Sequence, residues 1–119
     1  MASKKQRADV YSPDCPSRTV LDTLFSRWTG LVLMALLERT YRFRELSRRV
    51  GGVSEKMLAQ TLTQLEKDGF VKRVAYPEIP PRVEYSLTPM GREAAGLMQQ
   101  LGTWIQANLG RVLKHREAA

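Results

Sequence analysis

The residue types that carry most catalytic chemistry are scarce in this sequence. It contains one cysteine, Cys15, and one histidine, His115, at opposite ends of a chain of 119 residues. A zinc site needs about four ligands, usually including several Cys or His, and one cysteine cannot form a disulfide within its chain. The G-x-x-x-x-G-K-[ST], H-E-x-x-H and G-x-S-x-G patterns do not occur. We therefore expect no catalytic residues, no metal site and no cofactor, and we interpret the chain as something other than an enzyme.

A different group of residues lies on a helix that the sequence marks well. Ser54 is suited to begin it, because its hydroxyl can accept a hydrogen bond from a backbone N–H of the first turn. Gly69 is suited to end it, because glycine adopts the left-handed conformation without a steric penalty. Leucines recur between them at three- and four-residue spacing and predict a buried stripe: Leu58, Leu62 and Leu65.

The face of this helix opposite the leucines is polar and could contact DNA bases. At about 100° per residue, the side chains on or beside that face are Lys56, Gln60, Thr63 and Gln64. Gln can pair with adenine, Lys can donate to guanine, and Thr can contact the methyl group of thymine. These four residues are our candidates for base contacts, with an ordinary solvated face as the alternative.

The charge of the chain points to an anionic partner. Nineteen Lys and Arg stand against twelve Asp and Glu, which gives a formal net charge of +7. Nucleic acid is the first candidate and an anionic membrane surface the second. Phosphate contacts supply affinity and register rather than sequence preference, and the candidates for them are Arg42, Arg44, Arg48, Arg49, Ser54, Lys72, Arg73 and Arg82.

The elements that must position these residues follow from the hydrophobic periodicity. Helices are predicted from Ser17 to Trp28, with Gly30 near the end, and from Leu31 to Glu38, which is apolar nearly all round and belongs in a core. A short basic helix over 41–50 ends at a Gly-Gly pair. Alternation predicts strands over 70–76 and 83–87, joined by a proline-rich loop. A last helix of roughly 24 residues begins at Thr88-Pro89, and its apolar stripe needs a second surface.

This order of elements is that of a winged helix-turn-helix. In that motif one helix enters the major groove of DNA, the preceding helix supports it and the hairpin lies along the backbone. We therefore predict a mainly α fold with a small β-hairpin wing. Residues 1–12 are expected to form a flexible basic tail, 13–113 the domain with its dimerisation helices, and 114–119 a C-terminal tail. The longest apolar run, Leu31 to Leu37, is shorter than the roughly 20 residues of a membrane span, and residues 1–12 lack the apolar segment of a secretory signal. We expect no membrane partner.

Several short motifs follow one another at specific spacings. Cys15 precedes Trp28, and then come R-F-x-E-L at 42–46, V-S-x-K-x-L-x-Q at 53–60, L-E-x-D-G-x-V at 65–71 and P-P-x-V-E-Y-x-L-T-x-x-G at 80–91. In this order, over about residues 13–105, they resemble the HxlR-type family of bacterial winged helix-turn-helix transcriptional regulators. The chain departs from that family at Ala59, where a threonine is frequent, and at Tyr41, where a small residue is common.

The resemblance implies a homodimeric, sequence-specific regulator that binds double-stranded DNA in the bacterial cytoplasm, at the nucleoid. In this family the N- and C-terminal helices build the dimer interface. A two-fold dimer would place two groove helices about 34 Å apart and read a pseudo-palindrome. The corresponding interface candidates are Val20, Leu21, Leu24, Trp28, Leu97, Leu101, Trp104 and Ile105. Packing within one chain is the alternative for about half of them.

Some relatives of this kind sense electrophiles or oxidants through a cysteine near the first helix, and Cys15 occupies that place. The helix N-terminus and the nearby Arg18 would both favour its thiolate. Cys15 is therefore a candidate sensor, and an electrophile or another small molecule a candidate effector. The alternative is a small structural residue.

Two other functions remain open at this point. The winged helix could serve as a protein-interaction module, in which case the polar face of the Ser54–Gly69 helix would be dispensable. RNA binding is disfavoured, because the predicted strands lack the aromatic surface on which unpaired bases stack.

Overall fold

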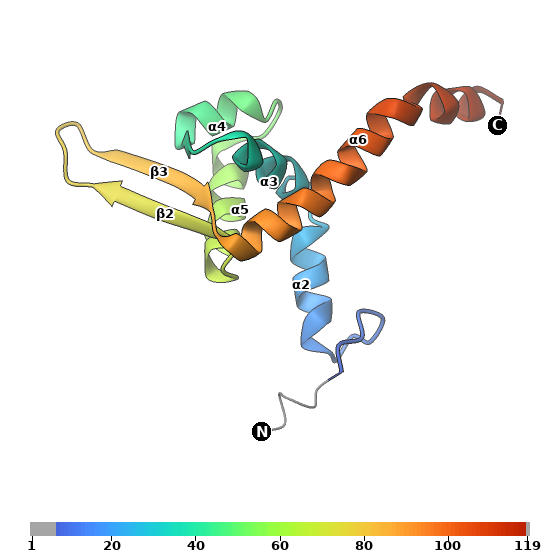
Figure 1. Cartoon of the computed structure of the whole chain (residues 1–119), viewed down its shortest axis with the longest axis horizontal. Helices are drawn as coiled ribbons and strands as arrows, with labels where there is room; N and C mark the ends of the chain where they lie inside the picture. The colour runs from blue at the N-terminus through green and yellow to red at the C-terminus, as the bar shows by residue number, and fades with distance from the viewer. Residues whose placement is uncertain (1–6, 119) are drawn as a thin grey trace.

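The computed structural model describes residues 7–118 and confirms the predicted fold class (Figure 1). A small antiparallel sheet carries helices on one side, and the hairpin extends away from them as a wing. The elements are α2 (Pro16–Leu24), α3 (Thr29–Glu38), β1 (Tyr41–Arg42), α4 (Phe43–Arg49), α5 (Glu55–Lys67), β2 (Val71–Tyr76), β3 (Arg82–Leu87) and α6 (Pro89–Ala118). Residues 1–6 of the predicted N-terminal tail lie outside the described residues.

The three strands are ordered β1-β3-β2. In the wing, Val71 lies opposite Leu87 and Tyr76 opposite Arg82. The third strand was not predicted, since residues 41–50 were assigned to one helix. Tyr41 and Arg42 instead pair with Tyr85 and Glu84 of β3. Two residues are too few to show an alternating pattern, so only the edge of β3 reveals this strand.

The core forms around α3, as its apolar composition predicted. Val32, Leu33, Ala35 and Leu36 of α3 are buried. Around them pack apolar residues of the other elements: Leu46, Leu58, Leu62, Leu65, Phe70, Val71 and Leu87. Since α5 presents its whole leucine stripe to this core, its polar face must point to solvent.

The helix boundaries near the N-terminus differ from the prediction. Helix α2 ends at Leu24 and α3 begins at Thr29, so Gly30 lies inside a helix. The hydroxyl of Ser26 bonds to the carbonyl of Thr23 at 2.9 Å and to the Thr29 hydroxyl at 2.5 Å. These local bonds compete with the helical pattern, and the two helices meet at a bend of 70°.

Helix α6 spans 30 residues and is longer than predicted. It continues through Ala118, so residues 114–118, expected in a tail, are helical. Only Gly91 and Ala95 of its described residues are buried. The first half packs across α3, and the second half projects away from the body of the molecule (Figure 1).

In the part of the chain that the structure describes, no single helix is both long enough and apolar enough to cross a membrane. Helices α2 and α3 together have the necessary length and composition. They are sharply bent, however, and α3 supplies buried core residues.

Candidate nucleic-acid interface

Helix α5 begins and ends as its sequence predicts. The Ser54 hydroxyl accepts a hydrogen bond from the Met57 backbone N–H at 3.0 Å, and Val53 packs against the core beside the helix start. Gly69 has a φ of 83° just after the helix, in the left-handed region that glycine tolerates. These contacts hold α5 at a defined position and rotation.

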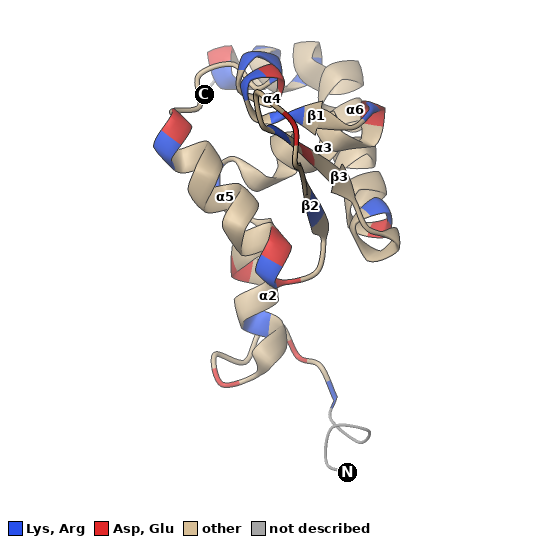
Figure 2. Cartoon of the chain, turned by 90° about the vertical axis from the view of Figure 1, so that its left-hand side faces the viewer, with Lys and Arg blue, Asp and Glu red and all other residues tan. Residues whose placement is uncertain are grey.

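The face of α5 that looks away from the core carries the predicted base-contact residues. Lys56, Gln60, Thr63 and Gln64 are all exposed. Charged residues stand at both ends of the helix and are absent from its middle (Figure 2). Gln60 and Thr63 therefore present neutral donors and acceptors, which suits reading the edges of bases.

Gln64 differs from the other three. Its side-chain amide donates to the Asp68 carboxylate at 3.2 Å. Gln64 and Gln60 also line a groove of about 310 Å³ between α2 and α5. Gln60 and Gln64 thus lie on the flank of α5 that faces α2, whereas Lys56 and Thr63 do not line this groove.

The candidate phosphate contacts fall into two sets. Within residues 7–118, those that form no salt bridge and are exposed are Arg42, Arg44, Arg48, Lys72 and Arg73. They belong to β1, α4 and β2, the basic segments around α5 in Figure 2. The residues of the other set already interact with groups of the protein. The Ser54 hydroxyl accepts the capping hydrogen bond, and Arg49 and Arg82 form salt bridges with carboxylates.

Arg49 is held by an ion pair that the sequence did not reveal. Its guanidinium donates to both carboxylate oxygens of Glu38, at 2.8 and 2.6 Å. The Tyr41 hydroxyl donates to the same carboxylate at 2.8 Å. Arg49, then Tyr41, lower the pKa of Glu38 to about 2. This network joins the end of α3 to α4, and it explains why a bulky Tyr41 fits where a small residue was expected.

Cys15 is the residue immediately before α2 and is half-buried. Its sulfur accepts hydrogen bonds from the Ser17 hydroxyl at 3.1 Å and the Asp9 backbone N–H at 3.4 Å. These bonds, led by that of Ser17, lower the pKa of the thiol. The expected contribution of Arg18 is absent, because its guanidinium turns to the Tyr11 carbonyl, 3.2 Å away, and towards Asp22.

The dimer-interface candidates also separate into two sets. Leu24 and Trp28 pack against the core of their own chain, and Leu21 is half-buried. The others are exposed: Val20, Leu97, Leu101, Trp104 and Ile105. Leu97 is 67% exposed and Trp104 54%. The exposed apolar stripe of α6 runs on through Leu109 and Leu113, which the candidate set missed although they continue the same spacing.

The described residues contain no group of three or more His, Cys, Asp or Glu side chains that could hold a metal ion. The geometry that remains is a supported helix with an exposed polar face, basic residues on neighbouring elements, and a long helix with an uncovered apolar stripe.

Three comparisons relate this arrangement to known proteins. The HxlR-like helix-turn-helix family matches residues 23–112. The uncharacterized HTH-type transcriptional regulator YtfH of Escherichia coli (strain K12) is 49% identical over 117 residues, which cover 98% of this chain and 93% of that protein. The structure of ytfH from Salmonella typhimurium is similar with a TM-score of 0.87 and 51% identity, over 93% of this chain and 99% of that chain. The redox regulator HypR in its oxidized form is more distant, with a TM-score of 0.72 and 35% identity over 79% of this chain and 97% of its own.

Proposed function

The chain belongs to the HxlR-like helix-turn-helix family and is a DNA-binding transcriptional regulator, and from this premise we propose that it acts as a homodimer on a pseudo-palindromic operator. One α5 helix enters the major groove of each half-site. A protein that binds bacterial chromosomal DNA acts in the cytoplasm. The proposed binding involves no cofactor.

The exposed face of α5 is the observation that carries this proposal. Its centre is uncharged, so Gln60 and Thr63 can meet base edges without repulsion from a carboxylate. Lys56 stands in the first turn, on the same face. A bidentate contact between a side chain and a base discriminates by about 1–3 kcal/mol, which is enough for a few such residues to select a site.

The basic residues on the neighbouring elements supply the affinity that does not depend on sequence. Arg44 and Arg48 of α4, together with Lys72 and Arg73 of β2, are exposed and form no salt bridge in the described part of the chain. Each phosphate that they neutralise releases counterions, so binding should weaken steeply with salt.

A second copy of this chain is the partner that the α6 stripe fits. Leu97, Leu101, Trp104 and Ile105 follow helical spacing and form one exposed row that runs from the half of α6 that packs on α3 into the half that projects. Exposed apolar rows of this length mark interaction surfaces. Two-fold pairing through α6, with Val20 of α2 beside it, would cover the row and set two α5 helices about one DNA turn apart.

Selection of bound duplexes from a random library, at about 0.15 M salt, tests this function. The expected result is an enriched pseudo-palindrome with half-sites one helical turn apart, and a dimer by sedimentation velocity. A variant with Lys56, Gln60 and Thr63 replaced by alanine should lose the enrichment and keep the dimer. Weak binding to every duplex by the native chain, without enrichment, would contradict it and favour a winged-helix protein-interaction module.

Cys15 supports an additional regulatory role for the same protein. Its lowered thiol pKa and partial exposure favour the thiolate, which is the nucleophilic form. Conjugate addition of the thiolate to an activated alkene forms one S–C bond as the C=C π bond breaks; the thiol proton passes to solvent, and solvent returns a proton to the adjacent carbon. We propose that this modification of Cys15, immediately before α2, changes DNA affinity. Alkylated native protein should differ from untreated protein in binding the selected duplex, while treated Cys15→Ser should not.

A further inference from the structure

One arginine of the wing, Arg82, is paired with carboxylates of the same hairpin. Arg82 Nη2 lies 2.8 Å from Glu78 Oε2, and its Nη1 lies 3.7 Å from Glu84 Oε2. The guanidinium also stacks over the ring of Tyr76, 4.0 Å from its centroid. Three neighbours on the two strands and their connecting loop therefore hold one cation.

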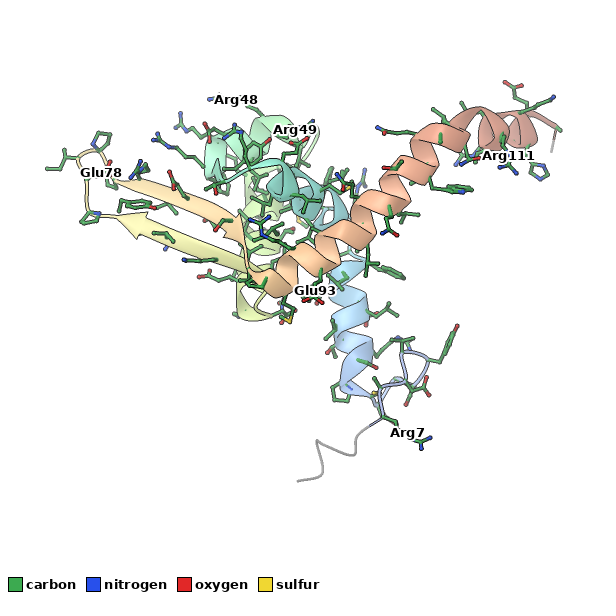
Figure 3. The ribbon with its side chains drawn as sticks, viewed as in Figure 1. Arg7, Arg48, Arg49, Glu78, Glu93 and Arg111 are labelled. Carbon is green, nitrogen blue, oxygen red and sulfur yellow. The ribbon has the colours of Figure 1, made fainter. Side chains whose placement is uncertain are left out.

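Arg82 is consequently drawn back against the hairpin. Its side chain is 30% exposed, and its Nε is buried without a hydrogen-bond partner in the described structure. Ile79, at the tip between Glu78 and the prolines, is fully exposed instead. Figure 3 shows Glu78 at this far end of the wing, away from the helices.

The charges of the wing are unevenly distributed along its length. Lys72 and Arg73, near its base, are exposed and form no salt bridge in the described part of the chain. At the tip Glu78 offsets Arg82, and Glu84 lies between the two regions, opposite Val74. A phosphate backbone that runs from α5 along the wing would meet attraction at the base and no net attraction at the tip.

We propose that Glu78 limits the affinity of the wing for DNA by holding Arg82 away from the phosphates. This inference rests on the proposed DNA binding and adds a residue that sets the affinity for DNA. A phosphate contact from Arg82 would strengthen binding to every duplex alike. With Arg82 retained, a larger share of the binding free energy comes from the base contacts of α5.

The test compares Glu78→Gln and Glu78→Ala with the native chain on the selected operator and on an unrelated duplex, over a range of salt. Both variants should bind both duplexes more tightly. The salt dependence should steepen by about 0.9 in log–log slope, equivalent to about an eightfold larger gain for each tenfold dilution of salt. The ratio of operator to unrelated affinity should not rise.

Glu93→Gln is the matched control. It makes the same change of charge at an exposed position on α6, outside the wing (Figure 3). The two Glu78 changes are also made in an Arg82→Gln background. If Arg82 causes the gain, Glu78→Gln in that background should improve binding no more than Glu93→Gln does.

Two outcomes would overturn the inference: an unchanged affinity in both Glu78 variants with native circular dichroism, or a full gain that persists in the Arg82→Gln background. In either case the native chain would still bind its operator. Absence of duplex binding by the native chain would instead remove the proposed function, and this inference with it.

Discussion

The indole of Trp28 lies against Gly52, in the turn that leads into α5. A Cβ atom built on Gly52 would stand 3.6 Å from Trp28 Cη2, and Gly52 itself has a φ of 89°. Trp28 ends the turn between α2 and α3 and packs against the core. One side chain at the start of α3 thus contacts the turn that leads into α5, the helix proposed to contact bases.

Trp28→Ala should therefore destabilise the folded protomer and weaken DNA binding. The substitution removes contacts of a half-buried ring. We therefore expect the free energy of unfolding to fall by about 2–3 kcal/mol, which is less than at a fully buried tryptophan. Urea denaturation should show the same loss at every protein concentration. Trp104→Ala is the matched control, because Trp104 lies on the exposed stripe of α6. Its effect should shrink on dilution and vanish where both proteins are monomeric, as expected for a lost dimer contact, and a concentration-independent effect there would contradict the proposed interface.

Gly91→Ala should be strongly destabilising. A Cβ at Gly91 would lie 1.9 Å from the Phe70 carbonyl oxygen, a backbone atom that also accepts a hydrogen bond from the Thr88 N–H. At Gly96, on the same helix, a Cβ would meet nothing within 4 Å. Gly96→Ala should stabilise α6 by up to about 1 kcal/mol through helix propensity. Thermal unfolding of both variants measures the contrast, and equal melting temperatures would refute the close approach of α6 to Phe70.

The Glu38–Arg49 pair should make stability depend on pH. The pKa of Glu38 is lowered from 4.5 to about 2 by Arg49 and Tyr41. A depressed pKa means that the folded state holds the carboxylate ionised where the unfolded chain binds a proton. Its contribution is present above about pH 4.5 and is lost as the pH falls towards 2. Glu38→Gln should thus be less stable than the native chain at pH 7, with a difference that shrinks between pH 5 and 2. Glu93→Gln makes the same change of charge at an exposed position outside the network and is the control variant.

Ser17→Ala should reduce the reactivity of Cys15. The Ser17 hydroxyl is the main donor that lowers the thiol pKa, so its removal should shift the pH profile of alkylation to higher pH. Labelling with iodoacetamide, followed by intact mass measurement, gives the rates. Ser26→Ala removes a hydroxyl that bonds to Thr23 and Thr29 rather than to the sulfur, and it should react like the native chain. Identical profiles for the native chain and Ser17→Ala would show that the hydrogen bond does not activate the thiol.

Gln60→Ala and Arg48→Ala should weaken DNA binding in different ways. The first should relax preference at one base position by about 1–3 kcal/mol. The second should weaken all duplexes alike and reduce the salt slope by about 1. Arg49→Ala, beside Arg48, is a useful third variant. Because Arg49 is paired with Glu38, its loss should lower the free energy of unfolding and leave the salt slope of DNA binding nearly unchanged. Competition titrations with single-base operator variants distinguish these effects, and unchanged base preference in Gln60→Ala would remove that residue from the contact set.

Much of this molecule follows from local sequence. The Ser54 cap, the leucine stripe and Gly69 determine where α5 starts, ends and faces, because each acts within a few residues along one helix. The apolar composition of α3 predicts its place in the core, and alternation predicts the two strands of the wing. The exposed polar face of α5, which we propose contacts bases, is therefore predictable from the sequence alone.

Other features depend on contacts between distant segments, and only the tertiary structure decided them. Strand β1 exists because β3 offers an edge to two residues that carry no periodic signal. Arg49 meets Glu38 because α4 folds back along the end of α3, and Arg82 meets Glu84 and Tyr76 because the strands pair in one register. Charge counting along the chain treats every arginine alike, whereas Coulomb attraction acts through space. The fold thus determines which arginines can serve the phosphate backbone and which are already paired.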